Sequence, residues 1–276
     1  MAPTTFRRKT KRKRFDPFVS SFLIASVLLL SFVLLPFVST LVQTSVGALA
    51  ETLTDVNVIG SLGLTFYAAA WATALALITG VPLAYLMARH NFRGKRWVEG
   101  IINLPIVVPH TAAGIALLTV FGRQAPLGQA FGALGIRFIE DVPGITAGML
   151  FVSLPFLVNA AREAFAMIDP ELEGVALTMG ASRWQAFLYV TLPLAWRGII
   201  AGAVMMWGRG ISEFGAVVIL AYNPKIIPVL VYERFAGFGL YAALPLTVVL
   251  ILSSLVVFVA LQVLLLPQKE FVLTDE

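Results

Sequence analysis

The chain has 276 residues, of which 59% are hydrophobic and 13% are charged, and its mean hydropathy is +0.89. Soluble domains carry about 25% charged residues, so this composition indicates a membrane protein. Cysteine is absent, which excludes disulfides and thiolate metal sites. The two histidines, His90 and His110, lie far apart without a metal-ligand spacing, which disfavours metalloenzyme chemistry.

The N-terminus is basic, with seven Lys and Arg residues in the first 14 positions. They could form a nucleic-acid-binding arm, but the 34 residues from Pro17 to Ala50 are uncharged. The positive-inside rule therefore favours a cytoplasmic tail over residues 1–17. Ala48-Leu49-Ala50 resembles a signal-peptide cleavage site. The apolar run over 18–42 exceeds the roughly 7–15 residues of a signal-peptide core, so we expect an uncleaved first helix.

Six segments are long and apolar enough to span a bilayer, which takes about 20 residues. They cover residues 18–42, 61–88, 99–121, 143–167, 194–221 and 241–266. We therefore predict an all-α membrane protein with six transmembrane helices. Lys and Arg gather on the side of the N-terminus, and the opposite side carries only Arg123, Arg137, Lys225 and Arg234. Both termini, including the tail over 267–276, are therefore predicted to be cytoplasmic.

Two features add detail to the spans. Trp97, Trp184 and Trp196 fall at the predicted cytoplasmic interface, where amphipathic rings prefer to lie. Pro105 and Pro109 interrupt the third span. Backbone groups that a proline frees inside a membrane need partners from protein or from a wet cavity. The third helix is therefore expected to line something other than lipid.

The longest cytoplasmic loop, residues 169–193, has the pattern of a short helix. Asp169 suits the N-cap, Pro170 suits the first helical position, and Gly180 suits the stop. One apolar stripe recurs at helical spacing, made of Leu172, Val175, Ala176 and Met179. The pattern predicts an amphipathic helix over 169–181 that either packs against the bundle or docks another protein.

This loop resembles the EAA loop of ABC importer permease subunits, in which a Gly precedes a hydrophobic-x-Leu-Pro motif by nine residues. Gly180 stands at that spacing before Val190-Thr191-Leu192-Pro193. Gly174-Val175-Ala176 replaces the expected Glu-Ala-Ala, with Glu173 just before it. The resemblance implies a coupling helix that inserts into a cleft of an ATPase subunit. The implied coupling residues are Glu173, Ala176, Gly180, Ala181, Ser182, Arg183, Leu192 and Pro193.

The resemblance extends over residues 57–266, preceded by a first helix and an external loop over 18–56. It is strongest to molybdate/tungstate permeases, with sulfate permeases second, and is carried by residues 104–114, 208–217, 227–228 and 232–234. It implies a homodimeric type I ABC importer permease in a prokaryotic cell membrane that conducts a tetrahedral oxyanion.

The implied partners are two cytoplasmic ATPase subunits, an extracytoplasmic oxyanion-binding protein and membrane lipid, with no nucleic acid. The chain lacks the G-x-x-x-x-G-K-[ST] sequence of nucleotide-binding loops. We therefore expect no enzymatic activity and no bound cofactor in this chain, with ATP and Mg²⁺ held by the ATPase subunits.

Two opposite charges, Arg209 and Glu213, lie within the fifth span. Each ion costs about 2.5–3.5 kcal/mol at mid-bilayer, so both must face protein or water. They form either a structural i,i+4 pair or an element of the translocation pathway or gate. His110 and Thr111 in the third span carry the same two alternatives. A charge pair attracts an oxyanion weakly, which suits a conduit better than a tight site.

Functions of other classes fit less well. A secondary anion transporter is expected to show inverted repeats, and no convincing repeat is present. A sulfate/thiosulfate permease remains the nearest alternative. An intramembrane enzyme would need a nucleophile with a base, or paired acids, and Arg209 with Glu213 is neither.

Overall fold

The computed structural model describes residues 17–265. The predicted tail over 267–276, and the predicted tail over 1–17 except for its last residue, lie outside the described residues. The first seven helices are α1 (Pro17–Gln43), α2 (Val46–Thr54), α3 (Val56–Arg89), α4 (Lys95–Val107), α5 (His110–Phe121), α6 (Pro126–Ala133) and α7 (Val142–Ala166). The others are α8 (Glu171–Thr178), α9 (Arg183–Ala186), a π-helical turn η1 (Phe187–Thr191), α10 (Leu192–Ile211), α11 (Gly215–Leu220), α12 (Ile227–Phe238) and α13 (Leu240–Leu265). The all-α class is confirmed.

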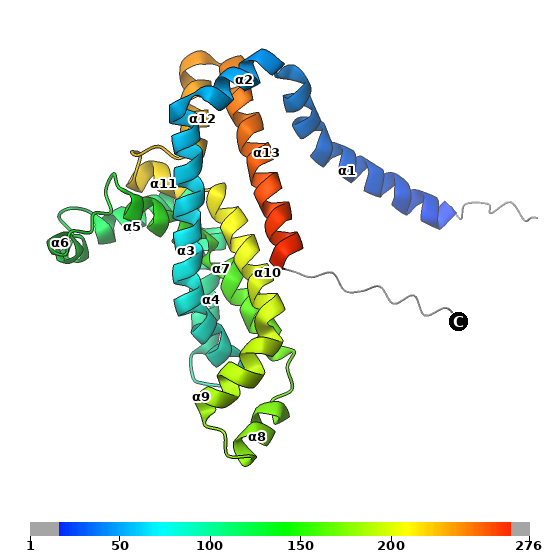
Figure 1. Cartoon of the computed structure of the whole chain (residues 1–276), viewed down its shortest axis with the longest axis vertical. Coiled ribbons are helices and arrows are strands. Elements are labelled where there is room, and N and C mark those ends of the chain that lie inside the picture. The colour runs from blue at the N-terminus through cyan, green and yellow to red at the C-terminus, as the bar shows by residue number, and fades with distance from the viewer. Residues whose placement is uncertain (1–16, 266–276) are drawn as a thin grey trace, which may run out of the picture.

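The core lies where α3, α7 and α10 pack against one another (Figure 1). Small residues permit the close approach of α7 and α10. A Cβ atom added at Gly198 would lie 2.4 Å from Ala164 Cβ, and one added at Gly202 would lie 2.7 Å from Ala160 Cβ. Backbones that approach this closely gain van der Waals contact, which drives helix association in lipid.

The spans differ from the predicted ones in two places. Five helical segments are long and apolar enough to cross a membrane, and a sixth span exists only if α4 and α5 are counted together. These two helices meet at a bend of 117°, so the interruption expected at Pro109 in the span over 99–121 is a sharp break between two helices. The fifth span runs over Arg183–Ile211 and then breaks, so the single continuous helix expected over 194–221 is wrong.

The N-terminal helix stands apart from the core. α1 leans away from the bundle, and α2 crosses from it to the top of α3 (Figure 1). Nearly all described side chains of α1 are exposed, including Phe22, Leu29 and Phe32. This apolar surface requires lipid or protein around it. The external loop expected within 18–56 contains α2.

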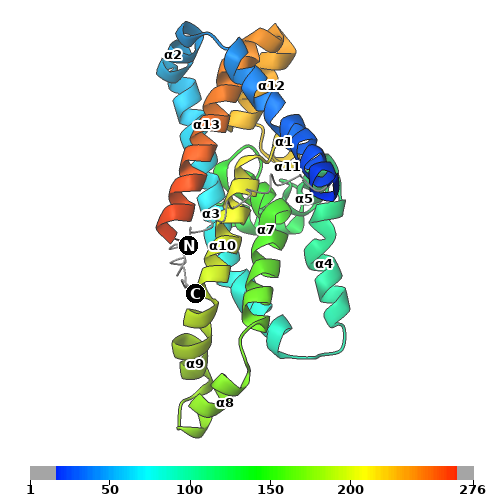
Figure 2. The same cartoon turned by 90° about the vertical axis from the view of Figure 1, so that its right-hand side faces the viewer.

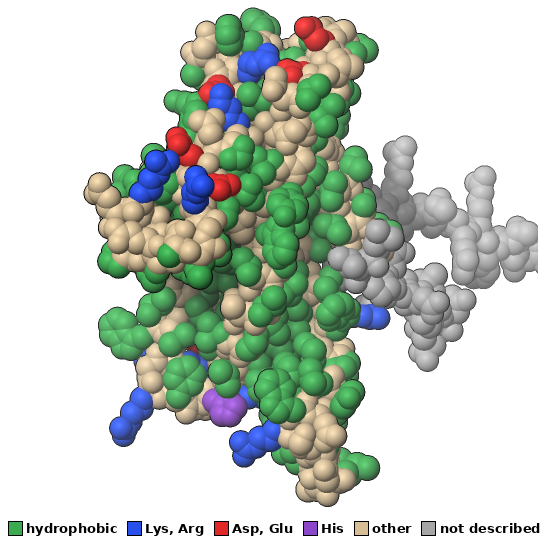
Figure 3. Space-filling view, turned by 60° about the vertical axis from the view of Figure 1, so that its left-hand side comes forward, with side chains coloured by type: hydrophobic (Ala, Val, Ile, Leu, Met, Phe, Trp, Pro, Cys, Tyr) green, Lys and Arg blue, Asp and Glu red, His purple; other side chains and the backbone are tan. Residues whose placement is uncertain are grey.

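At the other end of the molecule, the turned view places α8 and α9 beyond the main bundle (Figure 2). In the space-filling view, charged side chains are sparse in the middle of the face and gather toward its ends (Figure 3). That distribution is the one a membrane-spanning bundle requires, because charge is costly in hydrocarbon.

Candidate functional site

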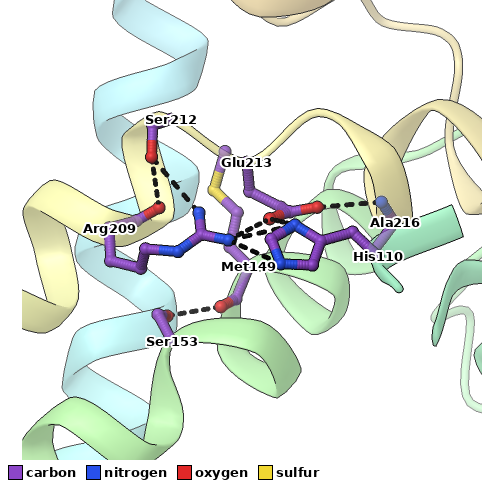
Figure 4. A network of polar contacts seen from close by, with 7 residues as sticks. All are labelled: His110, Met149, Ser153, Arg209, Ser212, Glu213 and Ala216. Carbon is purple, nitrogen blue, oxygen red and sulfur yellow. Dashed lines mark hydrogen bonds and ion pairs between the residues drawn. The ribbon is translucent and has the colours of Figure 1, made fainter. Parts of the chain in front are cut away.

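The first candidate site lies where two membrane helices break. The chain turns between α4 and α5 at Pro109, and between α10 and α11 over Ser212–Phe214. The short helices α5 and α11 pack closely against each other. This brings the two breaks together and places His110, Arg209 and Glu213 in one cluster (Figure 4). Irregular backbone at membrane depth is tolerated where it is buried in protein or lines a cavity.

Glu213 is the centre of this cluster, and its side chain is 0% exposed. Its Oε2 atom lies 3.1 Å from Arg209 Nη2 and 2.9 Å from His110 Nδ1. Its Oε1 atom accepts a hydrogen bond of 2.9 Å from the backbone N–H of Ala216. Both carboxylate oxygens are therefore occupied. The hydrogen bond from Ala216 also stabilises the start of α11, because the first N–H groups of a helix have no partner within the helix.

The contacts of Glu213 fix the histidine tautomer. An ionised carboxylate only accepts hydrogen bonds, so His110 Nδ1 carries the hydrogen. Arg209 Nη2 lies 3.0 Å from both ring nitrogens of His110, and in the neutral ring Nε2 is the one that can accept from it. Arg209 Nη1 also donates to Ser212 Oγ at 3.2 Å. Arg209 and Glu213 carry opposite charges that balance each other within the cluster.

Exposure differs among the residues that the sequence predicts for a pathway or gate. The side chain of Arg209 is 23% exposed and that of His110 is 38% exposed. Thr111, the second residue of α5, is exposed as well. A cation, a histidine and a hydroxyl can therefore meet an anion that approaches from outside the bundle, whereas Glu213 cannot.

Two glycines set the distance between α5 and α11. A Cβ atom at Gly215 would lie 2.7 Å from His110 Cβ, and one at Gly114 would lie 2.8 Å from the backbone oxygen of Ala216. Larger residues would push the helices apart and lengthen the contacts of Glu213. Below the cluster, Ser153 donates to the backbone oxygen of Met149 within α7 (Figure 4).

The second candidate site is the predicted coupling helix. α8 covers Glu171–Thr178, and Asp169 Oδ1 accepts from the backbone N–H of Glu171 at 2.9 Å. Gly180 has φ +93°, and the bond from Ala181 N to Ala176 O closes the C-terminus. Leu172, Val175 and Met179 are exposed, Met179 to 83%. The predicted helix is present but shorter, over Glu171–Thr178 instead of 169–181, with Pro170 and not Asp169 at the N-cap. Most of its apolar stripe has no cover within the described residues.

Glu173 anchors α8 to the membrane bundle. It accepts hydrogen bonds from Tyr85 Oη (2.9 Å), Arg89 Nε (2.9 Å) and Thr191 Oγ1 (2.8 Å). Arg89 also donates through Nη1 to the backbone oxygen of Ile168 at 2.8 Å. Burial raises the pKa of Glu173, but the bonds from Thr191, Tyr85 and Arg89 outweigh it, so the pKa lies below its usual value. One carboxylate thus joins α3, α8 and η1.

The remaining predicted coupling residues flank this anchor. Ser182 and Gln185 form a capping box that starts α9. Arg183 is the first residue of α9 and is exposed. Leu192 and Pro193 begin α10 directly after η1. They follow Thr191, which donates a hydrogen bond to Glu173 of α8. The Leu-Pro pair therefore lies where the segment bonded to α8 continues into α10.

Sequence reasoning missed several functional contacts. Tyr85, Arg89 and Thr191 meet Glu173 from positions 18 to 88 residues away in the chain. An arginine at the end of a long apolar helix is usually a solvated membrane-edge residue, so Arg89 gave no signal of its own. Ser212 lies within the quoted charged stretch, but its bond to Arg209 depends on the break in the helix.

The broken spans and the α8 helix that is hydrogen-bonded to the bundle fit a membrane component of a transport system. The chain belongs to the family of binding-protein-dependent transport system inner membrane components, whose profile matches residues 80–267. It is a multi-pass integral membrane protein of the ABC permease class.

Several relatives of similar length are described as permeases of oxyanion transport systems. The chain is 42% identical to the molybdate/tungstate transport system permease protein of Thermococcus kodakarensis, covering 79% of this chain and 83% of that one. It is 42% identical to the protein of the same description from Pyrococcus furiosus, covering 85% and 90%. A "probable sulfate transport system permease protein" of Chlorokybus atmophyticus is 34% identical, covering 71% and 70%.

A solved structure supports the fold independently. A chain of a bacterial alginate ABC transporter, crystallised with a periplasmic protein bound to an alginate pentasaccharide, superposes with a TM-score of 0.69. The match covers 89% of this chain and 92% of that one at 17% sequence identity. The expected ABC importer permease fold is therefore confirmed.

Proposed function

We propose that this chain is the permease subunit of an ATP-driven importer and forms the membrane pathway for molybdate or tungstate. The observation that carries the pathway is the meeting of two broken spans at Arg209, Glu213 and His110. Membrane transporters place substrate sites at such breaks, where backbone polar groups can face a cavity. The substrate follows from relatives that carry the molybdate/tungstate description at 42% identity.

The arrangement of charges suits the passage of an oxyanion better than its tight binding. Arg209 is the cation that an oxyanion can reach, and Glu213 already balances it at 3.1 Å. An entering anion must share Arg209 with this carboxylate, which weakens its binding and permits its release. Thr111 supplies an exposed hydroxyl donor near the start of α5. The rival interpretation is a purely structural charge pair that substrate never meets.

The conformational change of the ATPase subunits on binding and hydrolysing ATP would be transmitted to this chain through α8. Its exposed stripe of Leu172, Val175 and Met179 gives an ATPase subunit an apolar surface to hold. Movement of α8 would reach α3 through the bond between Glu173 and Arg89, and would reach α10 through Thr191. The coupling helix is thus tied to two membrane spans by hydrogen bonds, not only by the chain.

The proposed assembly has two copies of this chain, two cytoplasmic ATPase subunits that hold ATP and Mg²⁺, and an extracytoplasmic oxyanion-binding protein. Both termini lie in the cytoplasm, and the chain itself catalyses no reaction. The exposed apolar surface of α1 supports a second copy or lipid beside the bundle.

The test is uptake by the complete complex in proteoliposomes, with the binding protein and radiolabelled molybdate outside and ATP inside. We expect accumulation that requires ATP and that unlabelled tungstate suppresses at equimolar concentration. Sulfate is the second candidate substrate because of the Chlorokybus relative. Suppression by sulfate at the same concentration would assign the chain to sulfate import. Uptake driven by an ion gradient without ATP would overturn the ABC mechanism.

A further inference from the structure

A cavity of about 580 Å³ lies between the end of α3 and the hairpin formed by α8 and α9. α3 contributes its last two turns, including Pro82, Leu86 and Arg89, and α9 contributes Arg183 and Trp184. This end of the molecule lies beyond the main bundle (Figure 2). Trp184, which lines the cavity, is a residue type enriched at the membrane interface, and this supports a position of the cavity near the lipid headgroups.

The cavity is separate from the surface proposed to hold the ATPase subunit. Pro170, Glu173 and Leu177 of the α8 region line it. The exposed stripe of α8, represented by Val175 and Met179, lies on the opposite face, because each residue turns the helix by about 100°. An ATPase subunit seated on that stripe would therefore leave the cavity open to another occupant.

The wall of the cavity combines apolar surface with excess positive charge. Pro82, Leu86 and Leu177 supply apolar contacts, together with the rings of Trp184 and Phe187. Glu173 balances one of the two arginines, which leaves one positive charge while His90 is neutral. Arg183 is exposed and makes no ion pair with another described residue.

Arg89 has hydrogen-bonding capacity left over. Its side chain is 8% exposed, and its Nη2 atom is buried without a hydrogen-bond partner among the described residues. A buried, unpaired donor on a cation is costly, so an anionic acceptor that reached it through a small side-chain shift would be favoured. The field of a buried charge is also screened little by salt.

We propose that this cavity binds an anionic phospholipid, with the phosphate near Arg183 and Arg89 and an acyl chain along Leu86 and Trp184. A free phosphate would use only the cationic part of the wall, whereas a phospholipid also fills its apolar part. A zwitterionic lipid would gain less, because its headgroup carries no net charge to match the excess positive charge. The site depends on the membrane boundary and not on the identity of the transported anion.

The test is quenching of Trp184 fluorescence by brominated lipids in the full permease–ATPase complex in nanodiscs. The difference between the wild type and Trp184→Phe isolates the signal of this one tryptophan. We expect brominated phosphatidylglycerol to quench Trp184 more strongly than brominated phosphatidylcholine. Arg183→Gln should reduce this preference about fivefold, the factor expected for one charge beside an anionic lipid.

Matched variants and competitors make the outcome decisive. Arg183→Lys should keep the preference because it keeps the charge, and Arg197→Gln should keep it because Arg197 does not line the cavity. Equal quenching by the two lipids, or an unchanged preference in Arg183→Gln, would overturn the proposal. Loss of quenching on adding inorganic phosphate would assign the site to a free anion. Quenching seen only without the ATPase subunits would assign it to the partner protein. Transport is not the readout, so failure here would leave the proposed function unaffected.

Discussion

The carboxylate of Glu213 lies 2.9 Å from His110 Nδ1, although the two residues belong to different broken spans. This contact ties the start of α5 to the break that follows α10. Because Glu213 also holds Arg209 and the first turn of α11, one buried acid controls both the geometry and the charge of the proposed pathway.

Arg209→Gln should abolish uptake while the complex still assembles. The variant removes the cation that an entering oxyanion can reach, and a loss of about 1.4 kcal/mol or more lowers the rate roughly tenfold or more. Arg197→Gln is the matched control, since it removes an exposed arginine of the same helix away from the cluster. The measurements are ATP-dependent uptake and co-purification with the ATPase. Normal uptake by an assembled Arg209→Gln complex would contradict the pathway role.

Glu213→Ala should destabilise the permease more than Glu213→Gln. The alanine variant leaves Arg209 without its counter-charge and Ala216 N–H without an acceptor, and removing one partner of a buried ion pair costs about 3–5 kcal/mol. Glutamine keeps an acceptor for Ala216. Thermal unfolding of the purified permease should place glutamine between the wild type and alanine. Equal midpoints for all three would contradict the central role of Glu213.

Gly215→Ala should force α5 and α11 apart. The added Cβ atom would lie 2.7 Å from His110 Cβ and 3.2 Å from Thr111 N, and such overpacking costs about 1–3 kcal/mol. Gly208→Ala is the control, because its Cβ atom would meet Phe258 Cδ2 at an ordinary 3.7 Å. Thermal stability and uptake should fall only in the first variant. Equal behaviour of the two would show that the close approach is unimportant.

Glu173→Gln should uncouple ATP hydrolysis from transport. The neutral side chain weakens the charged bond to Arg89, so α8 would move without pulling α3. Uptake per ATP hydrolysed should fall severalfold. Glu171→Gln, in the same first turn but exposed, should keep the wild-type ratio. An unchanged ratio in Glu173→Gln would remove this residue from the coupling path.

Acid should release α8 from the bundle through the same residue. The folded pKa of Glu173 is below the usual 4.5 of a glutamate, so the ionised carboxylate stabilises the anchor above that value. The stabilisation is lost as the pH falls from 4.5 through the lowered folded pKa. Limited proteolysis across this range should show cleavage near α8 increasing toward acid. In Glu173→Gln, cleavage should already be high at neutral pH and should not vary with it.

The amino-acid sequence determined the elements that depend on local chemistry. Hydrophobic runs marked the membrane spans, and Asp169, Pro170 and Gly180 marked a helix that the structure contains as α8. Pro109 predicted an interruption of the third span, but not the bend of 117° that the structure has there. These features follow from capping, backbone dihedrals and burial in lipid, all of which act over a few residues.

Tertiary structure alone decided the contacts between distant segments. Ser212–Phe214 contains neither Pro nor Gly, and the break there is held by Glu213, which bonds Ala216 ahead of it and His110 across the bundle. The spacing of four residues suggested that Arg209 and Glu213 form a pair. It gave no sign that His110 contacts both of them. Glu173 likewise stood one position before the expected motif, and only the folding of α3 and η1 around it supplied its partners. A buried charge takes its role from the groups that surround it, and those groups are brought together only when the helices pack.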